Sequence, residues 1–182
     1  MLKVIKRLLG IKKVEWVKEL GIYSGISMGD YDGVKSYYNI NNDVNKNIEG
    51  NTPLGIAALN GRKDLVELLI NFGADPNCLD EELKSTPLHW IMCFRLGSDD
   101  ERFKNKEFKQ SHAIREIVTI LMNKRGNINA LTSDGETPLD YFNSQVIHRQ
   151  LNPMADEDID GLFKLLRKHG AKTSEELKAE EK

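Results

Sequence analysis

The pattern in this sequence that most resembles a catalytic motif is Gly-Ile-Ser-Met-Gly at residues 25–29. It fits the G-x-S-x-G nucleophile elbow of α/β-hydrolases, in which a strained turn between a strand and a helix exposes the serine hydroxyl. Ser27 lacks that context, because the repeat resemblance described below places it inside the first helix of a degenerate copy, and no parallel-sheet pattern occurs elsewhere. We therefore expect Ser27 to lie inside a helix and the chain not to be an enzyme.

Residues that could bind a metal also lack the necessary spacing. Asp-Tyr-Asp-Gly at residues 30–33 begins like a calcium loop, but Met28 stands where that loop needs an oxygen ligand, and Asn39 stands where it needs a glutamate. Asp30 is better explained as the N-cap of the helix that follows. The histidines do not have the spacing of zinc ligands. They are His89, His112, His148 and His169. We expect no metal and no cofactor.

Composition excludes several other functions. The 182 residues carry a formal net charge of −2, and the short basic stretches are not accompanied by aromatic residues. This does not favour nucleic-acid binding. The two cysteines, Cys78 and Cys93, are expected to be reduced, although a disulfide between them stays open. Lysines interrupt the apolar residues near the N-terminus, so a secretory signal is not expected. No later stretch approaches the roughly 20 apolar residues that a membrane span needs. A cytoplasmic location is predicted.

The tripeptide Thr-Pro-Leu occurs at Thr52, Thr86 and Thr137, each time before an apolar run. The threonine can cap a helix, and proline fits the first helical position because no N–H is needed there. After Thr52, two helical patterns follow, and the second should bury Leu68 and Leu69. The 34 residues from Thr52 to Thr86 lie within the repeat lengths typical of solenoids.

The segment GNTPLGIAALNGRKDLVELLINFGADPN, residues 50–77, is similar to the ankyrin repeat at many positions in order. The resemblance extends over about residues 22–172. It implies an all-α solenoid of helix–turn–helix units joined by short β-hairpin-like turns, and a small stand-alone array typical of bacterial proteins. The family places a histidine after Thr-Pro-Leu that links neighbouring repeats. Only His89 keeps it, whereas Gly55 and Asp140 replace it, so those links are in question.

The expected organisation has three parts. Residues 1–21 form an N-terminal capping helix region, or alternatively a basic helix that associates with a membrane surface. About four repeats follow, at residues 22–48, 49–82, 83–133 and 134–172, with insertions near 95–112 and 147–158. Residues 173–182 are a charged tail. The first insertion is either a solvated helical extension or an arm that contacts a partner.

The resemblance implies binding of another protein through the concave face, the hairpin tips and the insertion of the third repeat. The alternative is a bacterial immunity protein or inhibitor that neutralises a toxin enzyme, or an effector delivered to a host cell. The expected contact residues are Asn47, Ile48, Glu49, Asp80, Glu81, Glu82, Leu83, Ser133 and Asp134 at the tips, Leu59, Asn60, Trp90, Cys93, Phe94 and Gln145 on the first helices, and Phe103 and Phe108 in the insertion.

Two of these assignments have structural alternatives. Trp90 could pack between repeats instead of contacting a partner, and the polar tips could be solvated turn residues. The third repeat is expected to be the centre of the interface, because Trp90, Cys93 and Phe94 cluster there. The acidic tip at residues 80–82 would then form a rim that favours a basic partner.

Overall fold

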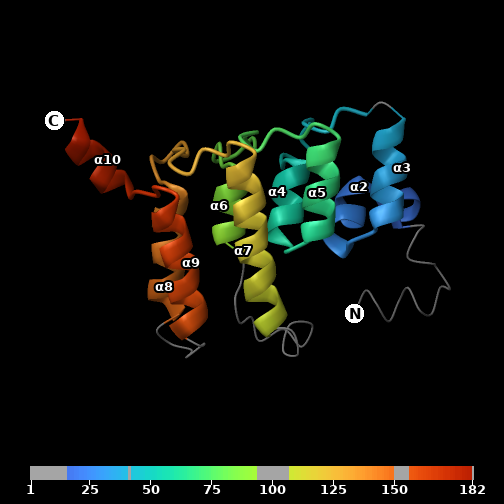
Figure 1. The fold of residues 1–182 in the computed structure, drawn as a ribbon. Helices are drawn as coiled ribbons and strands as arrows, with labels where there is room; N and C mark the ends of the chain where they lie inside the picture. Colours follow the sequence, from blue (N-terminus) through green and yellow to red (C-terminus); the bar gives the residue numbers. More distant parts are fainter. Residues whose placement is uncertain (1–15, 41, 94–106, 150–155, 182) are drawn as a thin grey trace.

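The computed structural model describes residues 16–40, 42–93, 107–149 and 156–181, and the rest is drawn in grey in Figure 1. The regular structure of these residues is entirely helical, apart from one isolated bridge between Ile48 and Asn51. The all-α prediction is therefore confirmed. The helices are α2 (Trp16–Met28), α3 (Tyr31–Asn39), α4 (Pro53–Leu59), α5 (Lys63–Asn71), α6 (Pro87–Met92), α7 (Glu107–Asn123), α8 (Pro138–Arg149), α9 (Asp156–Lys168) and α10 (Ser174–Glu180).

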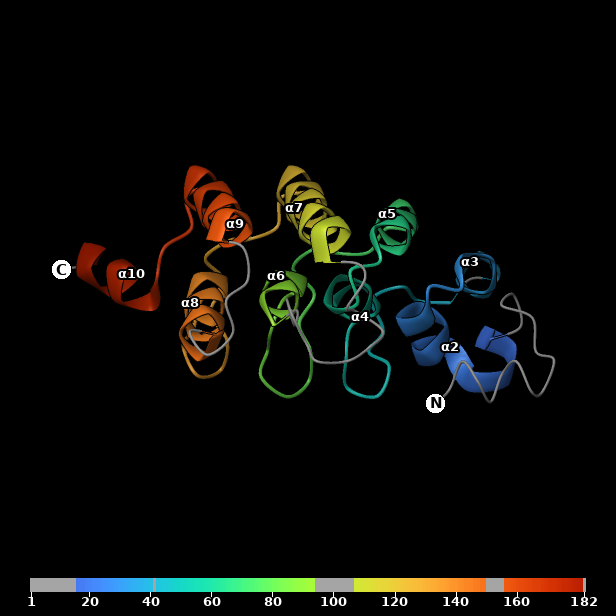
Figure 2. The same ribbon diagram turned by 90° about the horizontal axis from the view of Figure 1, so that it is seen from below.

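The helices form two rows (Figure 2). Helices α4, α6 and α8 make an inner row, and α5, α7 and α9 make an outer row that runs beside it. Hairpin loops extend from the inner row on the side away from the outer row. Helices α2 and α3 occupy one end of the array, whereas α10 projects past the other end (Figure 1). No helix among the described residues is long and apolar enough to cross a membrane.

The first helix pair agrees with the expectations for Ser27 and Asp30. Ser27 lies in α2, which is bent at Gly21, where φ is 79°. Asp30 caps α3, and its carboxylate accepts a hydrogen bond from the Gly33 N–H at 3.1 Å. The predicted capping helix at the N-terminus falls largely on residues 1–15, which lie outside the described part.

The repeated Thr-Pro-Leu performs the expected structural task. The Thr52 hydroxyl accepts the Gly55 N–H at 3.0 Å, and Thr137 accepts the Asp140 N–H at 3.2 Å. The leucine of each tripeptide is at most 1% exposed, as are Leu65 and Leu69 of α5, and Leu68 is 6% exposed. The expectation that Leu68 and Leu69 are buried is confirmed. One continuous core therefore runs along the array between the two rows.

Asparagine side chains join consecutive helix pairs outside this core. Asn45 donates to the Gly73 carbonyl and accepts the Asp75 N–H. Asn77 donates to the Arg125 carbonyl and accepts the Asn127 N–H. Asn129 donates to the Gly170 carbonyl and accepts the Lys172 N–H. We call these contacts the asparagine bridges. They repeat one geometry at three junctions, although the residues that they join lie 28, 48 and 41 positions apart.

Candidate functional site

A cavity of about 350 Å³ opens between two hairpins and the inner helix α6. Many predicted contact residues line it. They are Glu49, Asp80, Glu81, Glu82, Leu83, Trp90 and Cys93. The remaining lining includes His89 and Tyr141. We call this space the concave cavity, because it lies on the side of the array from which the hairpins project.

Trp90 forms one wall of the concave cavity and also connects neighbouring repeats. Its indole N–H donates to a carboxylate oxygen of Asp80 at 2.9 Å. Its ring lies so close to Gly55 that a Cβ there would be 3.1 Å from Trp90 Cδ1. A larger side chain at Gly55 of α4 would therefore have to displace the indole ring. Trp90 is half-buried, so inter-repeat packing leaves part of the ring exposed in the cavity.

Asp80 does not belong to an exposed acidic rim, contrary to the expectation from the sequence. It is 3% exposed, and its second carboxylate oxygen accepts the Leu83 N–H at 2.9 Å. Buried carboxylates need such donors, and here they come from Trp90 and the hairpin backbone. The exposed carboxyl groups around the cavity are those of Glu49, Glu81 and Glu82.

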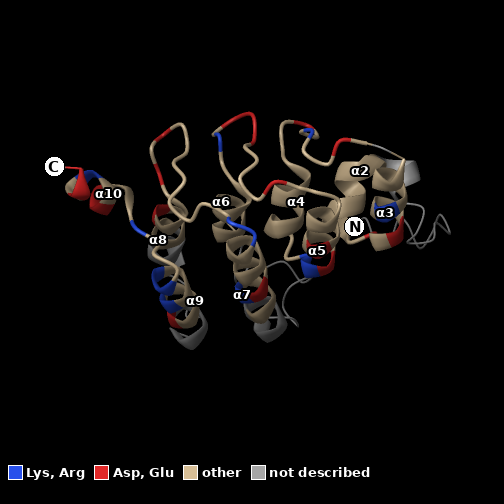
Figure 3. Ribbon diagram, turned by 45° about the horizontal axis from the view of Figure 1, so that its top comes forward, with Lys and Arg blue, Asp and Glu red and all other residues tan. Residues whose placement is uncertain are grey.

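The position of these glutamates is fixed by the hairpins. Glu49 and Gly50 both have positive φ, 52° and 81°, and close a tight turn between Ile48 and Asn51. The Glu81 N–H donates to the Gly50 carbonyl at 2.9 Å, which holds the two hairpin tips side by side. Figure 3 shows acidic segments on the loops that project along this edge. The carboxyl groups thus gather next to the aromatic wall.

A family model for ankyrin repeats (3 copies) matches residues 22–100, which contain this cavity apart from Tyr141. Residues 22–100 are ankyrin repeats. Ankyrin repeats are generally protein–protein interaction modules without catalytic activity. Among the described residues, no group of histidine, cysteine and acidic side chains could hold a metal ion.

A similar sequence occurs in Danio rerio, in the protein named "Putative palmitoyltransferase ZDHHC13". The two chains are 29% identical over 121 residues, which is 58% of this chain and 18% of that protein. The match is confined to the ankyrin region, and this chain spans less than a fifth of the relative. The likeness therefore concerns the repeats.

The other predicted contact residues lie around the concave cavity or outside the described part. Ser133 and Asp134 are exposed on the next hairpin, and the Ser133 N–H donates to the Leu83 carbonyl at 2.8 Å. Asn47, Ile48, Leu59 and Asn60 are half-buried and do not line the cavity. Phe94 and Phe103 fall outside the described residues. Phe108 and Gln145 lie in α7 and α8, but their side chains are outside the described part.

Tyr141 is a cavity residue that was not among those predicted from the sequence, although a signal was present. It stands four positions after Thr137, as Trp90 does after Thr86, so both rings occupy equivalent places on neighbouring inner helices. The Tyr141 ring meets His89 edge-on, with 5.3 Å between the ring centroids. Burial raises the pKa of the Tyr141 hydroxyl, which stays neutral at physiological pH. The cavity thus has two aromatic walls.

Asp140 stands where the family pattern has a histidine, and its carboxylate makes a link between neighbouring units in place of that histidine. One of its carboxylate oxygens accepts the N–H groups of Thr137 and Ser174, each at 2.9 Å. Burial alone would raise the pKa of Asp140, but these hydrogen bonds outweigh it and hold the pKa below the usual value. The bond to Ser174 ties α8 to the first residue of α10. Gly55 has no side chain to make such a bond, and Trp90 fills its space instead.

His89 makes the link that the resemblance implied. Its Nδ1 accepts the Thr86 N–H at 3.1 Å, so Nε2 carries the proton and donates to the Glu136 carbonyl at 3.1 Å. The ring is fully buried. Burial lowers the pKa of His89 more than its hydrogen bonds raise it, so the imidazole is neutral in the native state.

This neutral histidine predicts a pH dependence of stability. Below the ordinary histidine pKa of about 6.5, the unfolded chain binds a proton that native His89 resists, so stability should fall as pH decreases from there. Urea unfolding of the native sequence and of His89→Gln at several pH values tests this. The variant should lose less stability on acidification than the native sequence does. Equal slopes for the two proteins would contradict the assignment.

Proposed function

We propose that this ankyrin array binds another protein through its concave face, and that the concave cavity receives a lysine or arginine side chain of that partner. The observation that carries this proposal is the gathering of Glu49, Glu81 and Glu82 around a cavity with two aromatic walls. A cytoplasmic location, which we also propose, suits the two free thiols of Cys78 and Cys93.

The cavity has the chemistry that a basic side chain needs. Aromatic faces attract cations, and the alkyl stem of lysine or arginine packs well against rings such as those of Trp90 and Tyr141. The exposed carboxylates at the rim can pair with the charged end, and they attract a basic partner before contact. The hydrogen bond between Glu81 and Gly50 holds two hairpin tips in place, so little conformational entropy is lost on binding.

We also propose that the insertion of the third repeat contributes to this interface. Cys93 lines the cavity, and the chain leads from it directly into residues 94–106. Phe94, Phe103 and Phe108 would add apolar contacts beside the basic side chain. Aromatic residues are enriched among the positions that contribute most to protein–protein binding.

A random peptide library displayed on phage tests the proposal. Peptides selected on the full chain should contain lysine or arginine, and binding of synthetic copies is then measured by fluorescence anisotropy and stopped flow. Replacing Glu81 and Glu82 together by lysine should slow association at least about tenfold and reduce its salt dependence. Asp32→Lys with Glu175→Lys is the matched control, since both carboxylates are exposed on α3 and α10 and the charge change is equal.

The outcome distinguishes a local site from a general charge effect. If the control pair slows association as much as the Glu81 and Glu82 pair, the concave cavity is not the binding site. Selection of peptides without basic residues would also count against the proposal. Both double variants must keep the thermal stability of the native protein for the comparison to be valid.

A further inference from the structure

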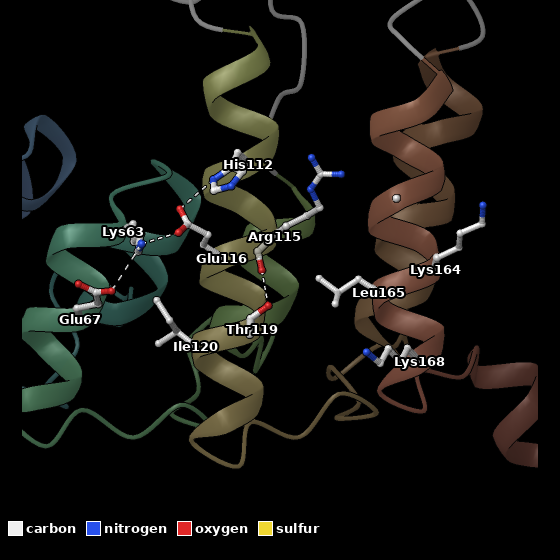
Figure 4. Close-up of a pocket in the computed structure, with 11 residues that line it drawn as sticks. Lys63, Glu67, His112, Arg115, Glu116, Thr119, Ile120, Lys164, Leu165 and Lys168 are labelled. Carbon is white, nitrogen blue, oxygen red and sulfur yellow. Dashed lines mark hydrogen bonds and ion pairs between the residues drawn. The ribbon is translucent and has the colours of Figure 1, made fainter.

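A second recess lies on the outer row of helices, away from the hairpins. Its volume is about 610 Å³, and residues of α5, α7 and α9 line it. We call it the outer-helix groove, and Figure 4 shows its lining. Ile120 and Leu165 contribute apolar surface, and the cationic side chains of Arg115, Lys164 and Lys168 lie at its α7 and α9 sides. Nothing in the proposed function uses this groove.

The charges of the groove are distributed unevenly. On the α5 side, Lys63 lies 2.6 Å from Glu116 and 3.9 Å from Glu67, and His112 also contacts Glu116. This side is therefore balanced by its own carboxylates. On the α9 side, Lys164 pairs with Asp160 but is 73% exposed, and Lys168 has no ion pair among the described residues. The α9 side of the groove is thus the positive one.

Gly161 shapes the groove and has no role in a turn. It lies within α9, where glycine costs about 1 kcal/mol relative to alanine. A Cβ at this position would be 2.6 Å from Nη1 of Arg115, so the guanidinium group lies directly on the α9 backbone. The glycine allows Arg115 to extend from α7 across the groove. Gly161 thus lowers the intrinsic stability of α9, and its lack of a side chain leaves room for the Arg115 guanidinium group beside the apolar surface of the groove.

We propose that the outer-helix groove is a second docking surface, which takes an acidic amphipathic segment of a partner protein. Apolar side chains of that segment lie on Ile120 and Leu165, and its carboxylates face Lys164 and Lys168. Charge complementarity selects this occupant, because the exposed lysines Lys164 and Lys168 make the α9 side of the groove positive. The array then connects two partners of different chemistry, or two parts of one partner.

The acidic C-terminal helix of a second copy is a poor candidate for this groove. In α10, Glu176 accepts hydrogen bonds from Arg167 of the same chain at 2.6 and 3.0 Å. Glu180 is likewise held by Lys172 at 2.7 Å. These pairs keep the two glutamates in contact with their own chain, and docking on another copy would break them.

The test uses the full chain and a fluorescein-labelled synthetic peptide. This peptide contains only glutamate and leucine, arranged so that it forms an acidic amphipathic helix. We expect binding by fluorescence anisotropy, and we expect Lys164→Glu with Lys168→Glu to weaken it at least about tenfold. Lys35→Glu with Lys178→Glu is the matched control, because these lysines are exposed on α3 and α10 and the net charge change is identical. The control and the Glu81 and Glu82 variant should bind the helix like the native protein.

Several results would overturn the proposal. They are failure of the acidic helix to bind, equal binding of a helix in which lysine replaces glutamate, and equal weakening by the control pair. The proposal would also fail if sedimentation velocity showed concentration-dependent self-association of the native protein and if Lys164→Glu with Lys168→Glu abolished it. In that case the groove is an interface between copies of this chain, and the proposed occupant is wrong.

Discussion

Replacing Leu69 with alanine should lower the free energy of unfolding by about 2–5 kcal/mol, the usual cost of removing a core leucine. Leu69 lies in α5 and is fully buried in the core between the two rows of helices. The lost methyl groups leave a cavity that the neighbouring helices close only in part, because each helix is also held by its own neighbours. Urea unfolding followed by circular dichroism measures the change.

Leu131→Ala is the control for this experiment. Leu131 is 52% exposed, so the same chemical change should alter stability by less than about 0.5 kcal/mol. A small effect at Leu69, comparable to that at Leu131, would mean that this face of α5 does not contribute to the core.

Replacing Gly55 with histidine should destabilise the protein by about 1–3 kcal/mol, although histidine is the residue that the family pattern prefers there. A Cβ at Gly55 would lie 2.7 Å from the Thr52 hydroxyl oxygen and 3.1 Å from the Trp90 ring. The variant must displace either the helix cap or the indole. Displacement of the indole also separates its N–H from Asp80, which a change in tryptophan fluorescence would report.

A double-mutant cycle identifies the cause of this loss. In a Trp90→Leu background the space beside Gly55 is larger, so Gly55→His should cost clearly less than in the native background. If the cost is the same in both backgrounds, Trp90 is not the reason for the glycine. Thermal unfolding of the four proteins gives the comparison.

Much of this fold could be predicted from the sequence because it depends on local rules. Thr52 caps a helix through its own side chain, and Pro53 fits the first helical position whatever surrounds it. The leucines at helical spacing, such as Leu65 and Leu69, indicate which side of α5 faces inward. Asp30 is recognised as a cap for the same reason. None of these inferences requires knowledge of a distant part of the chain.

The features that the sequence did not predict depend on contacts between repeats. Asp80 resembles an ordinary tip residue until Trp90, ten positions later, is seen to donate a hydrogen bond to it. A side chain at Gly55 would meet Trp90, which belongs to the next repeat. The outer-helix groove was not predicted because the ankyrin resemblance implies contacts at hairpins and first helices, yet Gly161 within a helix was a visible signal. Such pairings depend on tertiary geometry that residue spacing does not specify.

The asparagine bridges make this chain suitable as a modular scaffold. Asn77 and Asn129 make the same contacts as Asn45, even though each reaches across one of the two long insertions. Because the bridges fix how the flanking helices meet, we expect the protein to tolerate exchange of the inserted segments for others of different length. Doubling the length of a flexible loop costs only about 0.6 kcal/mol. An epitope or a fluorescent reporter could therefore replace the first insertion while the neighbouring repeats keep their register.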